Sequence, residues 1–167
     1  HVVVKAGEKS GAHVRSPGED YAEGDLAFAA GTPLGAAQLA VLAALGIDTV
    51  SVRRHPRIAV IATGNELVPP GQPLGFGQIH ESNALMLASL ARESGAQVVA
   101  QRSVRDDPEA LRIALLDAAA DADVVVTSGG VSAGEADHLP DVLRSIGEIH
   151  FHKVRLKPGM PTLFGQI

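Results

Sequence analysis

The sequence has no cysteine and no tryptophan, and aromatic residues make up only 3% of its 167 positions. The lack of cysteine excludes disulfides, thiolate metal sites and a cysteine nucleophile. With so few aromatic rings, the hydrophobic core has to consist mainly of valine, isoleucine, leucine and alanine. No run approaches the roughly 20 apolar residues of a membrane span, and no signal peptide is recognisable. We therefore expect a cytoplasmic protein with no membrane partner.

Basic residues are also outnumbered: 14 lysines and arginines stand against 19 aspartates and glutamates, which gives a formal net charge of −5 at pH 7. Proteins that bind nucleic acids or membrane surfaces broadly carry a basic surface, so we expect neither kind of partner. A chain of 167 residues, 46% of them hydrophobic, suffices for one domain with a sizeable core and a smaller appendage. The first residue is not methionine and the sequence ends abruptly, so we expect a fragment of a longer protein.

Residues 1–52 are expected to form an N-terminal linker or partial domain, a small mixed segment with one helix. Glycines divide this segment into short pieces that are typical of turns. Thr32 is a plausible N-cap, Pro33 suits the first helical position, and Gly46 suits the end of the helix. Residues 47–52 alternate in polarity and predict a short strand, although the pattern is ambiguous.

Residues 53–167 show a different pattern, in which unbroken apolar segments alternate with amphipathic ones. This pattern predicts βαβ units, and therefore an α/β fold of three layers with a mostly parallel sheet flanked by helices. The predicted strands are 58–62, 97–100, 123–130 and two last candidates within 148–154 and 161–167. The predicted helices are one around 82–94 with Ser82 or Asn83 as cap, one that Asp107 caps and Pro108 begins, and one at 139–146.

Polar residues follow the first three predicted strands, at the edge where parallel sheets bind their ligands. Gly129 and Gly130 lack side chains, so their N–H groups and nearby hydroxyls can form a nest for an anion. Acidic residues near the same edge suit magnesium, which usually takes one or two carboxylates and completes its shell with water and phosphate. The hydroxyls are those of Thr127, Ser128 and Ser132, and the acids are Glu66, Asp106, Glu135 and Asp137.

A cluster of cations stands near the end of the chain. If residues 153–157 form a strand, Lys153, Arg155 and Lys157 lie on one of its faces, where like charges oppose folding. Such a cluster in an acidic protein suits one small anion. Cations, N–H donors and carboxylates at one edge together predict an anionic substrate bound with magnesium.

Each feature also has a structural reading. The Ser-Gly-Gly loop is commonly a simple turn, Asp107 can serve only as a cap, and Glu135 suits the first turn of a helix. The three cations are also compatible with a solvated edge, and the histidines match no metal motif. The sequence contains no Gly-x-Ser-x-Gly elbow, no P-loop and no dinucleotide fingerprint, which argues against the enzymes that use them.

Several segments resemble the molybdenum-cofactor-binding domain of the MoeA family, the molybdopterin molybdenumtransferases, which includes the E domains of gephyrin and its plant counterpart. The resemblance is carried by "PRIAVIATGNELVPPGQPLGFGQIHESNALML", "VRDDPEALRIAL", "ADVVVTSGGVSAGEADHLPDVL" and "FHKVRLKPGMPTLFG". It runs nearly unbroken from Arg53 to Ile167. The earlier part is similar to the family more loosely, through "GAHVRSPGEDYAEGDLAFAAGTPL" and "LAALGIDTVSV".

The resemblance implies that the protein inserts molybdate into adenylated molybdopterin and releases AMP, with magnesium as cofactor. It also implies a homodimer of the full-length protein and a molybdopterin adenylyltransferase as a possible partner. Family members continue beyond the position of Ile167, so residues 53–167 are expected to be a C-terminally truncated domain. The family site includes regions outside this sequence and part of a second subunit, so the fragment alone is expected to bind poorly and to be inactive.

The resemblance also implies which residues act. The positions that match functionally important family residues, and are therefore expected to be catalytic, are Glu66, Asp106, Asp137, Lys153 and Lys157, with Asp106 and Asp137 as the magnesium ligands. The positions expected to bind the cofactor are Thr63, Gly64, Thr127, Ser128, Gly129, Gly130, Ser132 and Pro161.

Three positions depart from the family pattern: Asn65 replaces an aspartate, His80-Glu81 replaces a Tyr-Asp pair, and Met160 replaces a lysine of the molybdate site. Methionine supplies no charge and only a weak acceptor, which bears on molybdate binding more than on adenylate binding. Two alternatives therefore stay open. One is an enzyme like the molybdopterin adenylyltransferases or the nucleotide pyrophosphatases that share this domain, and the other is a non-catalytic molybdopterin-binding scaffold.

Overall fold

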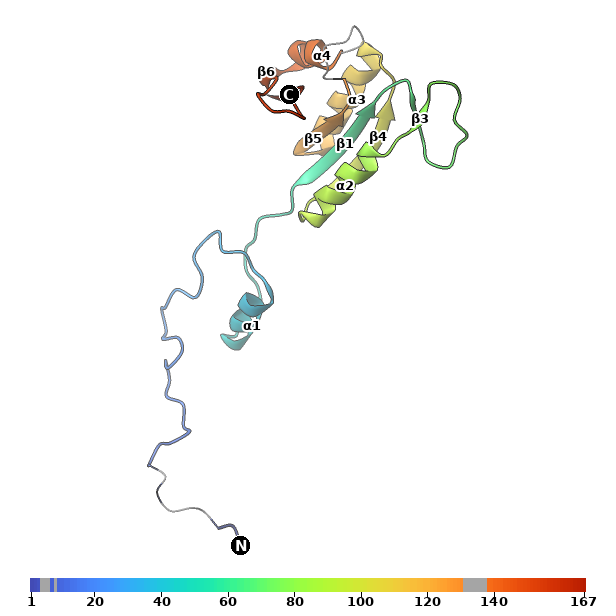
Figure 1. Ribbon diagram of the computed structural model, residues 1–167. Coiled ribbons are helices and arrows are strands. Elements are labelled where there is room, and N and C mark those ends of the chain that lie inside the picture. The colour runs from blue at the N-terminus through green and yellow to red at the C-terminus, as the bar shows by residue number, and fades with distance from the viewer. Residues whose placement is uncertain (4–6, 8, 131–137) are drawn as a thin grey trace. The chain divides into compact units, whose positions relative to one another are not determined.

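The computed structural model describes residues 1–3, 7, 9–130 and 138–167. It divides into two compact units, His1–Val52 and Arg53–Ile167, which are described separately (Figure 1). No helix in the described part of the chain combines the length and the apolar composition that a membrane span requires.

The first unit contains the helix α1 (Ala36–Ala44), which begins later than Thr32 and Pro33 predict. Its N-cap is Gly35, whose N–H donates to the side-chain oxygen of Gln38 at 3.2 Å. Gly46 ends the helix as predicted, with a φ of 75° and an N–H that donates to the carbonyl of Ala43. The strand predicted at residues 47–52 is wrong, because a strand needs a neighbour to pair with and the described part of this unit contains none.

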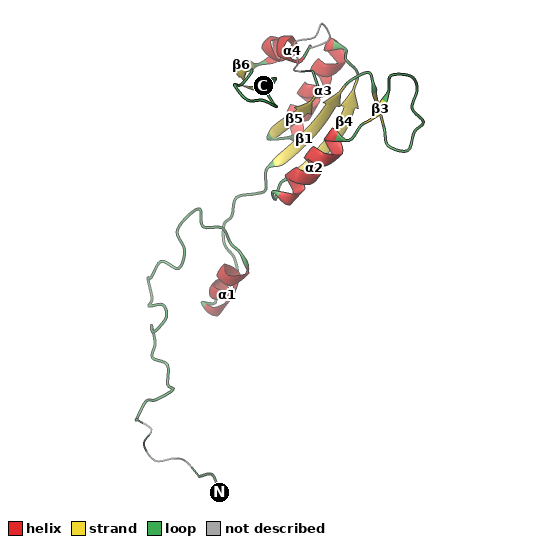
Figure 2. Ribbon diagram, viewed as in Figure 1, coloured by secondary structure: helices red, strands yellow, loops and turns green. Residues whose placement is uncertain are grey.

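The second unit is built on a parallel sheet in the order β4-β1-β5 (Figure 2). These strands are β1 (Arg57–Thr63), β4 (Gln97–Val104) and β5 (Val124–Ser128). At the carboxyl ends, Thr63 lies opposite Val104, and Ala62 lies opposite Ser128. All three strands therefore end at the same edge, as the sequence predicts.

Helices cover both faces of this sheet. On one face, α2 (Asn83–Glu93) packs against Val60 and Ala62 of β1. On the other face, α3 (Pro108–Asp121) and α4 (Leu139–Ile146) pack against Ala59 and Ile61. Successive side chains of β1 thus enter two different hydrophobic clusters, which explains why the strand has to be apolar on both faces. The three-layer α/β fold predicted from the sequence is confirmed.

The remaining strands lie outside the parallel sheet. A short parallel pair, β2 (Leu67–Val68) and β3 (Ile79–His80), was not predicted. The last two strands, β6 (Glu148–His152) and β7 (Leu163–Gln166), form an antiparallel pair that contacts α4. The possible strand at 153–157 is not formed, because Lys153 turns the chain with a φ of 70° and the following residues belong to the β6–β7 loop. Side-chain alternation therefore no longer places Arg155 beside the two lysines.

Asp123 ties the beginning of β1 to the beginning of β5. Its carboxylate accepts two hydrogen bonds of 2.5 Å from the guanidinium of Arg54 and one of 2.8 Å from the N–H of Arg57. Its own N–H donates to the carbonyl of Arg57 at 2.8 Å. The Arg54 guanidinium, and after it the Arg57 N–H, hold the pKa of Asp123 far below its usual range.

We expect Asp123→Asn to lower the melting temperature at neutral pH, with a gap from the wild type that narrows in acid. A carboxyl whose pKa is depressed by folding stabilises the protein above its unfolded pKa of about 3.9, and this stabilisation is lost as the pH falls toward the folded pKa. Thermal unfolding between pH 2 and 7 measures the gap. Asp121→Asn is the control, since that exposed carboxylate makes one longer ion pair, of 3.5 Å, with Arg57. A gap that stays constant with pH contradicts the assignment.

Candidate functional site

The edge formed by the carboxyl ends of β1, β4 and β5 gathers several of the predicted site residues. Thr63, the last residue of β1, has only 5% of its surface exposed. Its hydroxyl donates a 2.7 Å hydrogen bond to Oδ1 of Asp106, which follows β4 and is half-buried. The predicted meeting of the first two strand ends is therefore present, and Thr63 directs its hydroxyl to Asp106.

A second, reciprocal contact fixes Asp106. The N–H of Asn65 donates to Oδ2 of Asp106 at 3.1 Å, and the N–H of Asp106 donates to Oδ1 of Asn65 at 3.3 Å. Each carboxylate oxygen thus accepts one hydrogen bond from the end of β1 or the loop after it. A carboxylate oxygen has two lone pairs, so each keeps one for a ligand or a metal ion. We call Thr63, Asn65 and Asp106 the carboxylate clamp.

Asp107, the next residue, has a different task. Its Oδ1 accepts a 2.7 Å hydrogen bond from the N–H of Ala110 and thereby caps α3, while Pro108 occupies the first helical turn, as predicted. The adjacent acids are thus divided between two purposes, because only Asp106 reaches the edge of the sheet.

Two glycines close the edge beside the carboxylate clamp. Gly129 and Gly130 follow β5 with φ angles of 93° and 70°, a region that glycine adopts readily. A Cβ atom on Gly129 would lie 2.3 Å from the carbonyl oxygen of Thr63. A Cβ atom on Gly130 would lie 3.0 Å from Cγ2 of Thr63. The loop after β5 therefore packs on the end of β1 at a distance that no larger residue allows.

The third part of the edge joins β5 to α2. The side-chain amide of Asn83, the first residue of α2, donates a 3.0 Å hydrogen bond to the hydroxyl of Ser128. Ser128 and the preceding Thr127 are half-buried at the end of β5. The sequence marks Asn83 only as a possible helix cap, so its link to Ser128 was missed.

The helix cap itself comes from Glu81. This side chain is 7% exposed, and its Oε1 accepts a 2.6 Å hydrogen bond from the N–H of Ala84. Ser82 is the N-cap residue, in agreement with one of the two predicted caps, but its side chain makes no capping bond. The first turn of α2, and Asn83 with it, is held by a buried carboxylate that the sequence marks only as a departure from the family.

Other predicted site residues are placed without converging on the carboxylate clamp. Glu66 is exposed and lies over Gly64, where an added Cβ would meet its carboxylate at 2.6 Å. Lys153, Lys157 and Pro161 are exposed in the β6–β7 loop. No interaction within the described ranges joins these three to the edge of the parallel sheet.

The β6–β7 loop is organised by its backbone. The N–H of Lys153 donates to the carbonyl of Thr162 at 2.8 Å, and the carbonyl of Met160 accepts from Val154 and Thr162 at 2.9 Å each. The side chain of Met160 is 57% exposed. The backbone of Met160 shapes this loop, whereas the residue itself is largely exposed.

Of the two residues predicted to bind magnesium, only Asp106 lies in the described part of the chain. Among residues 1–3, 7, 9–130 and 138–167, no group of three or more histidine, aspartate or glutamate side chains could hold a metal ion. Asp106 belongs to this part, whereas the predicted Ser132, Glu135 and Asp137 lie outside the described residues. One carboxylate with free lone pairs fits a magnesium ion that takes its other ligands from phosphate and water.

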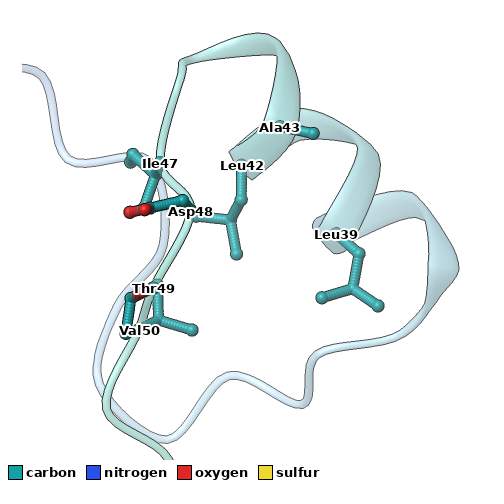
Figure 3. Close-up of a pocket in the computed structure, with 7 residues that line it drawn as sticks. All are labelled: Leu39, Leu42, Ala43, Ile47, Asp48, Thr49 and Val50. Carbon is teal, nitrogen blue, oxygen red and sulfur yellow. The ribbon is translucent and has the colours of Figure 1, made fainter.

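A pocket of about 290 Å³ lies in the first unit, between α1 and the segment that follows it. Figure 3 shows Leu39 and Leu42 projecting from the helix toward the segment that carries Thr49 and Val50. Asp48 is the only ionisable residue in its lining. The pocket therefore lacks the converging polar groups that the edge of the parallel sheet provides.

Comparison with known families identifies both parts of the chain. Residues 59–167 match the family model described as "Probable molybdopterin binding domain". Residues 1–46 match the model of the MoeA N-terminal region, domains I and II.

Similar proteins carry related names. A molybdopterin molybdenumtransferase from Nostoc sp. is 41% identical over 96% of this chain and 37% of its own length. Molybdopterin molybdenumtransferase 2 from Mycobacterium tuberculosis is 40% identical over 99% of the chain and 42% of its own length. The crystal structure of a molybdopterin biosynthesis MoeA protein from Pyrococcus horikosii is 41% identical with a TM-score of 0.77, and the match covers 90% of this chain and 37% of that one. The chain thus spans about two fifths of the length of these curated relatives.

Proposed function

This chain belongs to the MoeA family, and we propose that it provides the molybdopterin-binding part of a molybdopterin molybdenumtransferase. In this proposal the whole protein inserts molybdate into adenylated molybdopterin and releases AMP. The observation that carries the proposal is the edge of the parallel sheet, where a clamped carboxylate stands beside two glycines that let the loop after β5 pack on the end of β1. The names of relatives that are about 40% identical support it.

In this proposal, different residues of the edge bind different parts of the substrate. Ser128, Gly129 and Gly130 bind the phosphate of the pterin, since hydroxyl and N–H donors without intervening side chains suit an anion. Asp106 holds magnesium or positions water, and its orientation is set by Thr63 and Asn65. Bound magnesium would neutralise charge on the phosphates. Glu66, Thr127 and the glycine backbone of Gly64 line the approach to this edge.

The β6–β7 loop contributes cations in the same proposal. Lys153 and Lys157 bind phosphate or molybdate oxygens, while Pro161 shapes the loop beside them. Ser132 and Asp137 complete the phosphate and magnesium sites. The further proposals are that residues 1–52 form a partial domain separate from 53–167, that the full-length protein is a cytoplasmic homodimer, and that a molybdopterin adenylyltransferase delivers its substrate.

The proposal is tested by incubating the full-length protein with adenylated molybdopterin, molybdate and magnesium. AMP and metallated cofactor should appear together. We expect Lys157→Ala to weaken the binding of adenylated molybdopterin by about 10- to 100-fold, because a charge-assisted hydrogen bond is worth roughly 1.5–3 kcal/mol. Calorimetric titration measures the affinity.

Arg155→Ala is the matched control, because it removes the same charge from the same exposed loop. It should change the affinity by less than about threefold, as exposed charges do. Equal losses in both variants would refute the assignment of Lys157. Binding of molybdopterin without AMP release would identify a non-catalytic scaffold, an alternative that the uncharged side chain of Met160 favours.

A further inference from the structure

The hydroxyl of Ser128 is polarised by its neighbour. A serine hydroxyl offers one proton and two acceptor lone pairs. Asn83 presents its side-chain N–H₂ group, a donor only, to the oxygen of Ser128 at 3.0 Å. The Ser128 proton therefore has to find another acceptor, and no residue in the described ranges supplies one.

The surroundings of Ser128 restrict what that acceptor can be. Ser128 is half-buried and directly precedes Gly129 and Gly130, at the same edge as Asp106. On its other side, Asn83 is held in the first turn of α2, where Glu81 binds the N–H of Ala84, a residue only 1% exposed. The donor that Asn83 presents is thus part of a fixed helix end.

We propose that Asn83 is a positioning residue that keeps the Ser128 proton available for an acceptor-only group of the ligand, a phosphate oxygen of the pterin. This inference rests on the proposed molybdopterin site and adds to it a basis for recognising the phosphate. A phosphate oxygen without a proton only accepts hydrogen bonds, so it pairs with a hydroxyl whose proton is not donated to a protein acceptor.

Asn83→Asp tests the inference because it changes the polarity of one contact without changing its shape. The aspartate carboxylate accepts the Ser128 proton, so that the hydroxyl no longer donates to phosphate. We expect the affinity of the full-length protein for molybdopterin to fall about 10- to 100-fold in calorimetric titration, since a charge-assisted hydrogen bond is lost. An acid in the first turn of a helix is favourable, so the melting temperature should be unchanged or higher.

Ser82→Asp is the control for charge alone. It places the same negative charge on the preceding, exposed residue, which makes no hydrogen bond to Ser128. We expect a loss of affinity below about threefold for this variant, in line with a screened surface charge. Equal losses for Asn83→Asp and Ser82→Asp would overturn the inference, as would an unchanged affinity of Asn83→Asp.

Two further measurements connect the effect to the hydroxyl and to the phosphate. In a Ser128→Ala background, Asn83→Asp should cause less than about a threefold further loss, since coupled residues are non-additive. With molybdopterin from which the phosphate has been removed, Asn83→Asp and the wild type should bind equally. A penalty that persists in either measurement overturns the inference. A wild-type protein that binds neither form overturns the proposed function instead.

Discussion

Replacing Gly129 with alanine is expected to abolish molybdopterin binding and to destabilise the protein by roughly 2–6 kcal/mol. The backbone at this position has a φ of 93°, which L-residues rarely adopt. The added Cβ would also lie 2.3 Å from the carbonyl oxygen of Thr63. That oxygen belongs to the buried end of β1, so the loop rather than the strand has to move. Moving the loop displaces the backbone that is proposed to bind phosphate.

Gly71→Ala separates the effect of the positive φ from the effect of the close approach to Thr63. Gly71 has a φ of 86°, but a Cβ added there meets no atom within 4 Å. Its replacement should therefore cost only the backbone strain, on the order of 1 kcal/mol, with binding unchanged. Urea denaturation gives both free energies of unfolding, and titration with molybdopterin gives both affinities. If the two variants lost equal stability, the close approach of the loop to Thr63 would be ruled out.

The central strand could be predicted because its environment demands one kind of sequence. Both faces of β1 are covered, so residues 58–62 have to be apolar without alternation. The neighbouring strand was predicted too short, because β4 continues to Val104 through exposed polar residues such as Arg102. An edge strand tolerates such residues, and a search for apolar runs ends where they begin.

Residues 153–157, which carry the three cations, show where a local sequence pattern fails to predict the end of a strand. Alternation predicts the faces of residues 153–157 only if the strand continues, and Lys153 ends it with a positive φ. The end of β6 is set by its pairing with β7 and by backbone bonds such as that from Lys153 to the carbonyl of Thr162. Pairing between two strands is a tertiary property, which the composition of one strand does not contain.

The residues that lie at the candidate site could be predicted from the sequence, but the hydrogen bonds between them could not. The rule that ligands lie at the carboxyl ends of parallel strands was enough to bring Thr63, Asp106 and Ser128 to one edge. Their hydrogen bonds join residues 43 and 45 positions apart in the sequence, Thr63 with Asp106 and Asn83 with Ser128. An asparagine at a helix start is typical of a cap, so nothing in its local sequence marks Asn83 as a partner of β5.

On the proposed function, the second large effect is expected for Asp106→Asn in the full-length protein, which should slow AMP release by about 100-fold or more, the range typical of losing a catalytic acid–base group. Asparagine keeps one acceptor oxygen where aspartate offers two. Either the Thr63 hydroxyl or the Asn65 N–H then loses its acceptor. Thr63 is nearly fully buried, so leaving its hydroxyl unpaired would cost about 1–3 kcal/mol of stability. The lost carboxylate charge also removes the proposed magnesium ligand.

Asp107→Asn provides the comparison on the neighbouring residue. Asparagine and aspartate are equally good N-caps, so the hydrogen bond to Ala110 is retained and turnover should stay within about twofold of the wild type. Magnesium titration in the presence of AMP adds a measurement that does not depend on turnover, and only Asp106→Asn should weaken it. Turnover that survives in Asp106→Asn, or falls equally in both variants, would mean that the carboxylate clamp only holds the loop after β1. A selective loss would mean that the end of β1 orients the carboxylate on which the reaction depends.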